Sequence, residues 1–399
     1  MYDHLLERLV RPAESKILLL VADGLGGLPS TVTGKTELEE AVKPAIDSLA
    51  RKSALGVTDP IAPGITPGSG PAHLGLFGYD PLRWVIGRGI LSALGIGFAV
   101  EADDLTARGN YATLDSAGVV TDRRAGRIPT EVNQEISSLL DGMVVGDTRV
   151  FVRAEKEHRV AVIFRGKGLS DALTDSDPQA AGQRPREVKP LEPAAQESAR
   201  MVNAFLVEAD KRLKARRPAN GILLRGFAKH PSLPPFPSRY GMRACAIASY
   251  PMYKGLARLV GMDVIDGLES VEAEVEALAK AWPAYDFFYF HFKKTDSRGE
   301  DGDFAGKVKA IEELDRWLPE ITKHEPDVVV LTGDHSTPSV LKMHSWHPVP
   351  LAIRSRYVIP DGLDFSERSC ARGNLGRVRA VEVMPLAMAN AGRLEKYGA

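Results

Sequence analysis

Acidic and imidazole side chains follow apolar segments at several points of this 399-residue chain. The clearest case is the β-branched run 328–332, which leads through Gly333 into Asp334 and His335. Such a run predicts a buried strand, and open α/β sheets bind their ligands beyond the carboxyl ends of strands. A carboxylate beside an imidazole suits a divalent transition metal, although a carboxylate after a strand is about as often a helix N-cap.

A second candidate ligand closes the apolar run 17–22, where Asp23 precedes a glycine-rich turn. A dinucleotide-binding loop or a simple turn would also fit this position. No Gly-x-Gly-x-x-Gly spacing is present, however, and Asp23 would repel a phosphate group unless a cation lay between them. Its place at a strand end therefore favours metal binding.

Asp296 and Glu300 follow the aromatic-rich run 287–292, which predicts another strand. Asp303 is well placed to cap the helix that we expect from residue 304 to about residue 318. Asp296 and Glu300 are therefore not needed as helix caps. Solvated loop charge is their ordinary interpretation. If Asp296 and Glu300 lie close in space to the Asp334-His335 pair, they would form a second metal site.

Two histidines precede the strand that is expected at residues 349–353. His344 is the better ligand candidate of the two. His347 is explained equally well as part of a packed loop, so its role as a ligand stays open.

A nucleophile for such a metal site is offered by Ser69, which lies between Gly68 and Gly70 in a segment rich in glycine and proline. These neighbours favour a tight turn, and a helix can start within residues 72–77. The positive end of a helix dipole and a bound cation would both lower the pKa of the serine hydroxyl. A plain N-cap serine is the commoner role here, so the nucleophile interpretation depends on the ligands elsewhere.

Taken together, these segments resemble the alkaline phosphatase superfamily and, within it, the archaeal-type cofactor-independent phosphoglycerate mutases. The similarity spans nearly the whole chain. It rests on Asp23, Thr-Pro-Gly-Ser at 66–69 with Ala72, His73 and Leu74, Gly-Tyr-Asp-Pro at 78–81, Leu-Ser-Asp-Ala-Leu-Thr-Asp at 169–175, Thr295 with Asp296, Gly333-Asp334-His335, His-Ser-Trp-His-Pro-Val-Pro at 344–350 and Asn-Leu-Gly-Arg at 374–377. The resemblance implies an α/β fold, with an alkaline-phosphatase-like three-layer core around a central, mostly parallel sheet and an inserted smaller α/β domain.

The resemblance also implies two divalent metal ions and a set of ligands for them. One ion would be held by Asp23, Ser69, Asp334 and His335, and the other by Asp296, position 300 and His344. Relatives commonly have histidine at position 300, where this chain has Glu300. A carboxylate is a harder ligand than an imidazole, so manganese is the expected metal, with magnesium, cobalt and zinc as alternatives.

Composition excludes several classes of partner. The chain has 51 basic and 52 acidic residues, so it lacks the global field that would attract nucleic acid or an anionic membrane. No stretch approaches the ~20 apolar residues of a membrane span. Cys245 and Cys370 lack Cys-x-x-Cys spacing and are expected to be reduced thiols of a cytoplasmic protein. For the oligomeric state, a monomer and a homo-oligomer both remain possible interpretations of the sequence.

The chain length fits two domains. Because the candidate ligands come from both ends of the chain, residues 1–85 and 231–399 are expected to build one metal-binding, phosphatase-like core. Residues 86–230 would then form an inserted substrate-binding or cap domain, whose borders fall at segments rich in glycine and proline.

The predicted insertion carries most of the candidate substrate-binding residues. Guanidinium forks grip phosphate and carboxylate well, and Arg127 and Arg225 are the best candidates among its many arginines. His158 and Asp171 would hold glycerate hydroxyls, with ordinary surface roles equally open. The resemblance places a lysine near the nucleophile, and Lys254, in a predicted turn after a strand, would stabilise phosphoryl charge or protonate a leaving oxygen.

These implications define an isomerase of glycolysis and gluconeogenesis, whose partner is a small phosphorylated glycerate. It would interconvert 3-phosphoglycerate and 2-phosphoglycerate through a phosphoserine at Ser69. The alternative is a metal-dependent phosphatase or phosphodiesterase of the same superfamily, in which water takes the phosphoryl group. A silent binding protein would be expected to have lost the serine or several ligands, which this chain keeps.

Overall fold

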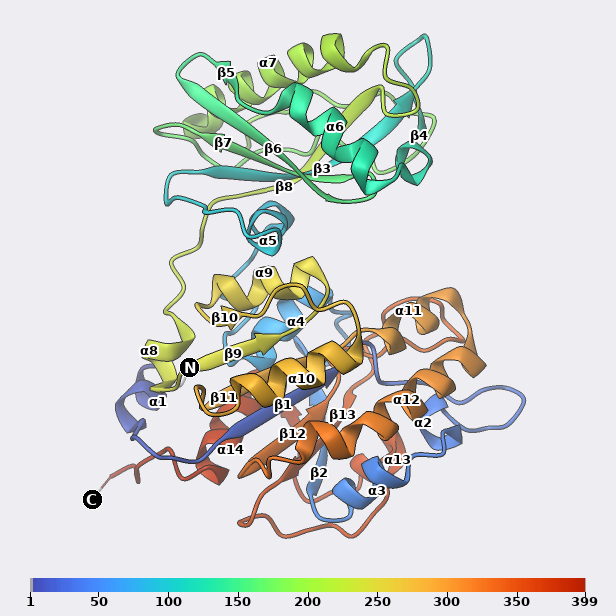
Figure 1. The fold of residues 1–399 in the computed structure, drawn as a ribbon, viewed down its shortest axis with the longest axis vertical. Coiled ribbons are helices and arrows are strands. Elements are labelled where there is room, and N and C mark those ends of the chain that lie inside the picture. The colour runs from blue at the N-terminus through green and yellow to red at the C-terminus, as the bar shows by residue number, and fades with distance from the viewer. Residues whose placement is uncertain (1–2, 399) are drawn as a thin grey trace. The chain divides into compact units, whose positions relative to one another are not determined.

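The computed structural model describes residues 3–398. The chain divides into two compact units, one formed by the residues up to Val85 together with those from Leu233 onward, and the other by Ile86–Ser232 (Figure 1). The first unit is therefore discontinuous in sequence. Each unit has its own sheet and its own apolar core.

An eight-stranded sheet forms the centre of the first unit. Its strands are β1 (Ile17–Ala22), β2 (Ala54–Asp59), β9 (Ala244–Ile247), β10 (Asp263–Val264), β11 (Phe287–Phe292), β12 (Val328–Thr332), β13 (Val349–Arg354) and β14 (Gly376–Arg379). Their order across the sheet is β10-β9-β11-β1-β12-β13-β2-β14, and only β13 runs antiparallel to its neighbours. The expected mixed α/β fold with a large, mostly parallel sheet is confirmed.

The helices of this unit connect the strands and vary in length from one turn to five. They are α1 (Asp3–Leu9), α2 (Glu37–Glu40), α3 (Pro44–Ala50), α4 (Ser69–Leu76), α8 (Phe236–Tyr240), α9 (Pro251–Leu259), α10 (Val271–Ala281), α11 (Lys294–Asp301), α12 (Phe304–Thr322), α13 (Glu367–Cys370), the 3-10 turn η3 (Ala380–Glu382) and α14 (Val383–Asn390). As predicted, Asp303 caps α12, because its side chain accepts a hydrogen bond from the backbone N–H of Gly306 at 2.8 Å.

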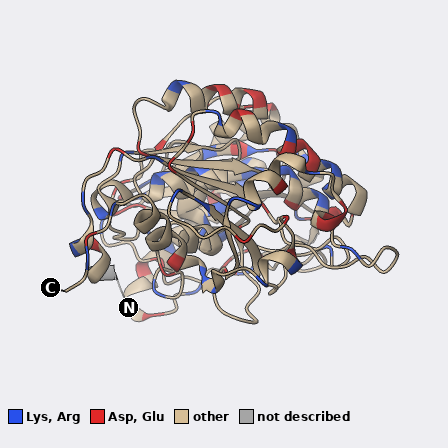
Figure 2. Cartoon of the chain, turned by 90° about the horizontal axis from the view of Figure 1, so that it is seen from below, with Lys and Arg blue, Asp and Glu red and all other residues tan. Residues whose placement is uncertain are grey.

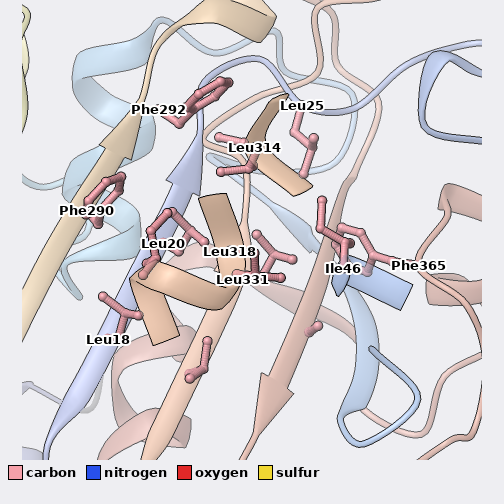
Figure 3. Close-up of a cluster of buried hydrophobic side chains, with 14 of the residues drawn as sticks. Leu18, Leu20, Leu25, Ile46, Phe290, Phe292, Leu314, Leu318, Leu331 and Phe365 are labelled. Carbon is pink, nitrogen blue, oxygen red and sulfur yellow. The ribbon is translucent and has the colours of Figure 1, made fainter. Parts of the chain in front are cut away.

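One face of the sheet is covered by an apolar cluster, part of which is shown in Figure 3. Leu18 and Leu20 of β1 and Phe290 of β11 pack there with Leu314 and Leu318 of α12. These strand residues alternate along the chain, as the two-residue period of a strand requires. The helix residues are four apart, so they lie on one face of α12.

The opposite face of the same strands carries aromatic and polar side chains. His291 of β11 stacks on Tyr253 of α9, with ring centroids 3.7 Å apart. Both rings also contact His73 of α4, at 5.3 Å and 4.8 Å between centroids. The first unit thus has helices on both faces of its sheet, in three layers.

Two segments that were predicted as a turn and a loop are helical. Lys254 lies in α9, where Pro251 occupies the first turn; proline is favoured there because the first N–H groups of a helix have no partner within it. Asp296 and Glu300 lie in α11 rather than in a loop. Their spacing of four residues places both carboxylates on the same side of that helix.

The second unit is built on an antiparallel sheet in the order β4-β3-β7-β6-β5, with β8 also paired to β3. Its strands are β3 (Leu105–Leu114), β4 (Val120–Asp122), β5 (Met143–Val145), β6 (Thr148–Lys156), β7 (Arg159–Arg165) and β8 (Gly221–Ala228). Its helices are α5 (Arg88–Gly95), η1 (Ala125–Arg127), α6 (Thr130–Leu140), η2 (Pro193–Ala195) and α7 (Gln196–Leu213). A separate apolar core packs α6 and α7 against this sheet.

Charge is mixed along the chain, with lysine and arginine interspersed among acidic residues (Figure 2). No helix among residues 3–398 combines the length and the apolar character that crossing a membrane requires. Cys245 and Cys370 are both buried and unpaired. Burial raises the pKa of each thiol to about 12, so neither is a reactive thiolate near neutral pH.

Candidate active site and metal-binding residues

Three neighbouring parallel strands bring the candidate ligands to one edge of the sheet in the first unit. In the register of β11, β1 and β12, Ala22 lies beside Phe292 and Val21 lies beside Thr332. The carboxyl ends of the three strands are therefore level. The loops after these strands must gather at the same edge, which is where open α/β sheets place their sites.

Asp23, Asp334 and His335 form the first cluster. All three are buried, and one ligand atom from each lies within 4.8 Å of the others. His335 Nε2 is 3.1 Å from Asp334 Oδ2 and 3.5 Å from Asp23 Oδ1. The backbone N–H of Gly24 donates to Asp334 Oδ1 at 3.0 Å and fixes the orientation of that carboxylate.

Two carboxylate oxygens of this cluster fit a bound cation. Asp23 Oδ1 and Asp334 Oδ2 are buried, and neither accepts a hydrogen bond from the residues that the structure describes. Burial alone would lower the pKa of His335, yet the neighbouring carboxylates, Asp334 above all, raise it to about 9. A divalent cation would satisfy both oxygens and replace the imidazole proton, so the donor set fits a metal.

Ser69 lies at the first position of α4, directly after the N-cap residue Gly68. Gly68 occupies the N-cap position, so the N-cap role does not apply to Ser69. Ser69 Oγ is instead 3.1 Å from His335 Nε2. One turn further along α4, His73 Nδ1 lies 2.8 Å from the backbone oxygen of Ser69 and 3.3 Å from Asp334 Oδ2. The serine hydroxyl is thus held against the first cluster.

Asp296, His335 and His344 form the second cluster, with one ligand atom from each again within 4.8 Å of the others. His344 Nε2 is 3.6 Å from Asp296 Oδ1 and 3.7 Å from Glu300 Oε1. The Glu300 side chain is 56% exposed, so it approaches this cluster from the solvent side. The predicted second set is brought together here, and His335 joins the two clusters.

The hydroxyl of Thr337 links the two clusters and orients His335. Thr337 Oγ1 donates to Asp296 Oδ1 at 2.9 Å, which uses its one proton. The contact of 2.9 Å between Thr337 Oγ1 and His335 Nδ1 must then have the imidazole as donor. His335 therefore directs Nε2 toward Ser69 and the carboxylates, as a metal-ligating histidine requires.

His347 lies apart from both clusters. Its Nδ1 contacts Ser345 Oγ at 3.1 Å, and its ring stacks on Trp346 with centroids 4.9 Å apart. These contacts are those of a packed loop. Of the two residues left open by the sequence, Glu300 is the one beside His344.

Lys254 pairs with an acidic residue of its own neighbourhood. Its Nζ donates to Asp266 Oδ1 at 2.9 Å, and Arg258 contacts the same carboxylate. No hydrogen bond or ion pair among the described residues joins the Lys254 ammonium to Ser69 or to either cluster. To act on a phosphoryl group, this lysine would have to leave Asp266.

In the second unit, Arg225 belongs to a cluster of cations. It lies directly opposite Arg108 in the antiparallel pairing of β8 with β3, and the Nε atoms of both are buried without a hydrogen-bond partner among the described residues. Burial, then Arg88 and Arg108, lowers the pKa of Arg225 to about 10. The nearby carboxylate of Asp177 is already held by two hydrogen bonds from Arg123. Like charges opposite one another are destabilising, so this arrangement fits an anionic ligand.

Three further substrate residues were predicted in this unit, namely Arg127, His158 and Asp171. Arg127 is exposed and ends the turn η1 in a left-handed conformation, with φ of 55°. His158 is buried, and burial followed by the charge of Arg159 lowers its pKa to about 4, so it is neutral near pH 7. Asp171 is exposed and accepts a hydrogen bond from the backbone N–H of Lys229 at 3.0 Å.

Comparison with known proteins identifies the family. The sequence model of 2,3-bisphosphoglycerate-independent phosphoglycerate mutases matches residues 50–220. A Thermus thermophilus protein named "Probable 2,3-bisphosphoglycerate-independent phosphoglycerate mutase" is 51% identical over 401 residues, which cover 99% of this chain and 98% of that protein. The chain belongs to this family. An Aquifex aeolicus member with the same name is 50% identical over 405 residues, covering 99% of each chain.

Solved structures support this membership in the phosphoglycerate mutase family. A Pyrococcus horikoshii protein of known structure matches with a TM-score of 0.83 and 31% identity, over 96% of this chain and 99% of that one. The cofactor-independent phosphoglycerate mutase from Thermoplasma acidophilum matches with a TM-score of 0.73 and 32% identity, over 95% and 100%. The family resemblance drawn from the sequence is confirmed.

Besides Thr337, Lys293 and Tyr253 lie beside the ligands of this mutase-family chain and were missed from sequence. Lys293 Nζ lies 2.9 Å from Asp23 Oδ2 and 2.5 Å from Asp296 Oδ2, so one ammonium bridges carboxylates of both clusters. The hydroxyl of Tyr253 donates to the same oxygen of Asp23. Lys293 directly follows β11, and this strand-end position was the available signal. Tyr253 reaches the site from α9, and nothing local to its segment indicates that contact.

Proposed function

We propose that this chain is a cofactor-independent phosphoglycerate mutase that interconverts 3-phosphoglycerate and 2-phosphoglycerate through a phosphoserine at Ser69. The observation that carries the proposal is the Ser69 hydroxyl, 3.1 Å from His335 Nε2 at the edge of a buried Asp-Asp-His cluster. The chain is 51% identical over nearly its whole length to a relative with that name. A small phosphorylated glycerate is the proposed partner, and the cytoplasm is the proposed location.

The reaction is a double phosphoryl transfer. Ser69 Oγ gives up its proton and forms a bond to phosphorus while the bond from phosphorus to the glycerate oxygen breaks. That oxygen leaves with the electron pair and takes up a proton, so the first transfer neither gains nor loses a proton. The other glycerate hydroxyl then attacks the phosphoserine and regenerates Ser69. Exclusion of water between the two transfers separates a mutase from a hydrolase.

Two sets of residues are proposed to hold divalent metals. Asp23, Ser69, Asp334 and His335 form one set, and Asp296, Glu300 and His344 form the other. Bound there, the cations would neutralise charge on the phosphoryl oxygens and lower the pKa of the serine hydroxyl. Manganese is the proposed metal because Glu300 adds an oxygen donor to the second set.

Residues 86–230 are proposed to supply most of the contacts to the glycerate. Arg225 has the strongest support, because it lies opposite Arg108 and the Nε atoms of both are buried without a hydrogen-bond partner among the described residues. Arg127, His158 and Asp171 are further proposed contacts. Lys254 is proposed to reach the phosphoryl group after leaving Asp266, and to stabilise its charge or protonate the leaving oxygen.

The test is a coupled assay of 2-phosphoglycerate formation from 3-phosphoglycerate, run beside a phosphate-release assay. Protein stripped with a chelator and reloaded with manganese, magnesium, cobalt or zinc supplies the metal comparison. We expect isomerisation without matching phosphate release, no activity after stripping and the best recovery with manganese. Phosphate release that outpaces isomerisation would assign a phosphatase instead, and full activity of metal-free protein would contradict the metal sites.

A further inference from the structure

A lysine lies buried beneath the candidate metal site without touching a ligand side chain. Lys307, in the second turn of α12, has no exposed surface. Its Nζ donates three hydrogen bonds to backbone carbonyl oxygens, to Gly24 at 2.9 Å, Gly26 at 3.0 Å and Thr337 at 2.9 Å. An ammonium group has three N–H donors, so every donor is used.

These three carbonyls belong to the two loops that carry the first cluster. Gly24 and Gly26 come after Asp23 at the end of β1, whereas Thr337 comes after Asp334 and His335 beyond β12. One ammonium group thus joins two segments that are more than 300 residues apart in sequence. All of its hydrogen-bond partners are backbone oxygens, so it makes none to a ligand side chain.

Two glutamates, the buried Glu37 and the partly buried Glu367, fix the outer parts of the same loops. Glu367 Oε1 accepts a hydrogen bond from the backbone N–H of Gly27 at 2.8 Å. Glu37 Oε1 accepts from the backbone N–H of Ser339 at 2.8 Å and from its hydroxyl at 2.6 Å. Burial lowers the pKa of Lys307, and the charges of Glu37 and Glu367, then of Asp296 and Asp23, oppose this effect. The lysine and the glutamates thus form one polar layer under the site.

The loops are packed so closely that they cannot adjust independently. The backbone N–H of Thr337 donates to the carbonyl of Gly26 at 3.0 Å. A Cβ atom at Gly26 would lie 2.8 Å from the Cβ of Ser336, which is nearer than such atoms approach one another. Loss of the ammonium would leave three buried carbonyls without this donor, and the loops would have to separate or admit water.

We infer that Lys307 is a positioning residue, which acts as an internal cation that sets the distance between Asp23 and the Asp334-His335 pair and thereby the affinity of the first metal site. The inference rests on the proposed function, because it assumes that this cluster binds metal. A residue that only stabilised the fold would change the free energy of unfolding and leave the affinity for metal unaltered.

The test compares Lys307→Met with the matched control Lys309→Met. Lys309 lies two residues further along α12, and it is exposed. Metal-free forms of both variants and of the parent would be titrated calorimetrically with manganese, cobalt and zinc, and the absorption spectrum of each cobalt form would be recorded. Melting temperatures with and without metal would be measured on the same samples.

For Lys307→Met we expect a metal affinity about 10- to 100-fold weaker than that of the parent, as is usual when support of a metal ligand is lost. We also expect an altered cobalt spectrum and a smaller rise in melting temperature on adding metal. Lys309→Met should match the parent in each respect. Equal metal affinity and equal cobalt spectra for Lys307→Met and the parent would overturn the inference, even if the variant melts earlier.

Metal titration of the parent protein distinguishes a failure of this inference from a failure of the proposed function. If the parent binds none of the three metals, the proposed metal site fails and the inference fails with it. Should Lys307→Met not fold, Lys307→Gln, which keeps two N–H donors without the charge, would be titrated instead. If neither variant folds even in saturating metal, Lys307 supports the whole fold, and a specific role in positioning the ligands is contradicted.

Discussion

The imidazole rings of His335 and His344 are stacked, with centroids 3.6 Å apart and an angle of 24° between their planes. One ring belongs to the Asp23-Asp334 cluster, and the other extends the site toward Asp296. The two candidate metal sets are therefore in direct contact rather than independent. A substitution that moves either imidazole is expected to affect the binding of metal at both.

Ser69→Ala should abolish mutase activity while leaving the fold intact. The free energy of unfolding is expected to change by less than about 1 kcal/mol, because Gly68 rather than Ser69 is the N-cap residue of α4. The coupled assay measures the activity, and intact-protein mass measured during turnover reports phosphoserine. Ser48→Ala, on α3, serves as the control and should behave as the parent. Mutase activity of Ser69→Ala above contamination would rule out the phosphoserine route.

Glu300→His should shift the order in which metals activate the protein. Glu300 lies 3.7 Å from His344 Nε2, so an imidazole in its place would add a nitrogen donor to the second set. Zinc and cobalt should then gain relative to manganese, with some activity retained. Asp301→His, at the next exposed position of α11, controls for the added histidine. An unchanged metal order and rate would show that Glu300 is only a surface residue.

Arg225→Gln should lower kcat/KM for 3-phosphoglycerate at least about 100-fold, as expected for loss of a charge-assisted contact to phosphate or carboxylate. The same variant should be more stable than the parent, by about 1 kcal/mol, because Arg108 and Arg88 no longer face a third, partly buried cation. Urea unfolding measures the second effect. Arg149→Gln, an exposed arginine of β6, should change neither quantity. A destabilised Arg225→Gln with normal kinetics would make Arg225 a structural residue.

Glu274→Gln should stabilise the protein at alkaline pH. Burial raises the pKa of Glu274 from 4.5 to about 7, against an opposing hydrogen bond from Ser249. The folded state therefore keeps a proton that the unfolded state releases between these values, so the free energy of unfolding falls as pH rises from about 4.5 to 7. The glutamine side chain does not ionise and avoids this loss.

Urea unfolding at pH 5 and pH 8 tests the expected pH dependence. The gain for Glu274→Gln over the parent should be roughly 3 kcal/mol at pH 8 and under about 1 kcal/mol at pH 5. Glu272→Gln, an exposed residue of the same helical turn, should show no such difference between the two pH values. An equal gain at both pH values would mean that the Glu274 carboxyl ionises normally.

Much of the site could be predicted from the sequence because its placement depends on local patterns. Apolar runs with strand character end at Asp23 and Asp334, and three parallel strands in level register bring their ligand-bearing loops to one edge of the sheet. Because a strand ends at one edge of its sheet, the ligands at these strand ends can be inferred from the apolar runs alone. The helical spacing of Ser69 with His73 and of Asp296 with Glu300 was not predicted, because the first helix was expected to start only at residue 72 and residues 296 and 300 were expected to lie in a loop.

Only the tertiary structure decided which distant side chains meet. Lys254 pairs with Asp266 because α9 forms where a turn was predicted, and Tyr253 from the same helix reaches Asp23. Arg108 faces Arg225 through the pairing of strands more than 100 residues apart, and Lys307 joins two loops that are separate in the chain. Such contacts depend on how whole elements pack, and no pattern within one segment encodes the partner that lies across the sheet.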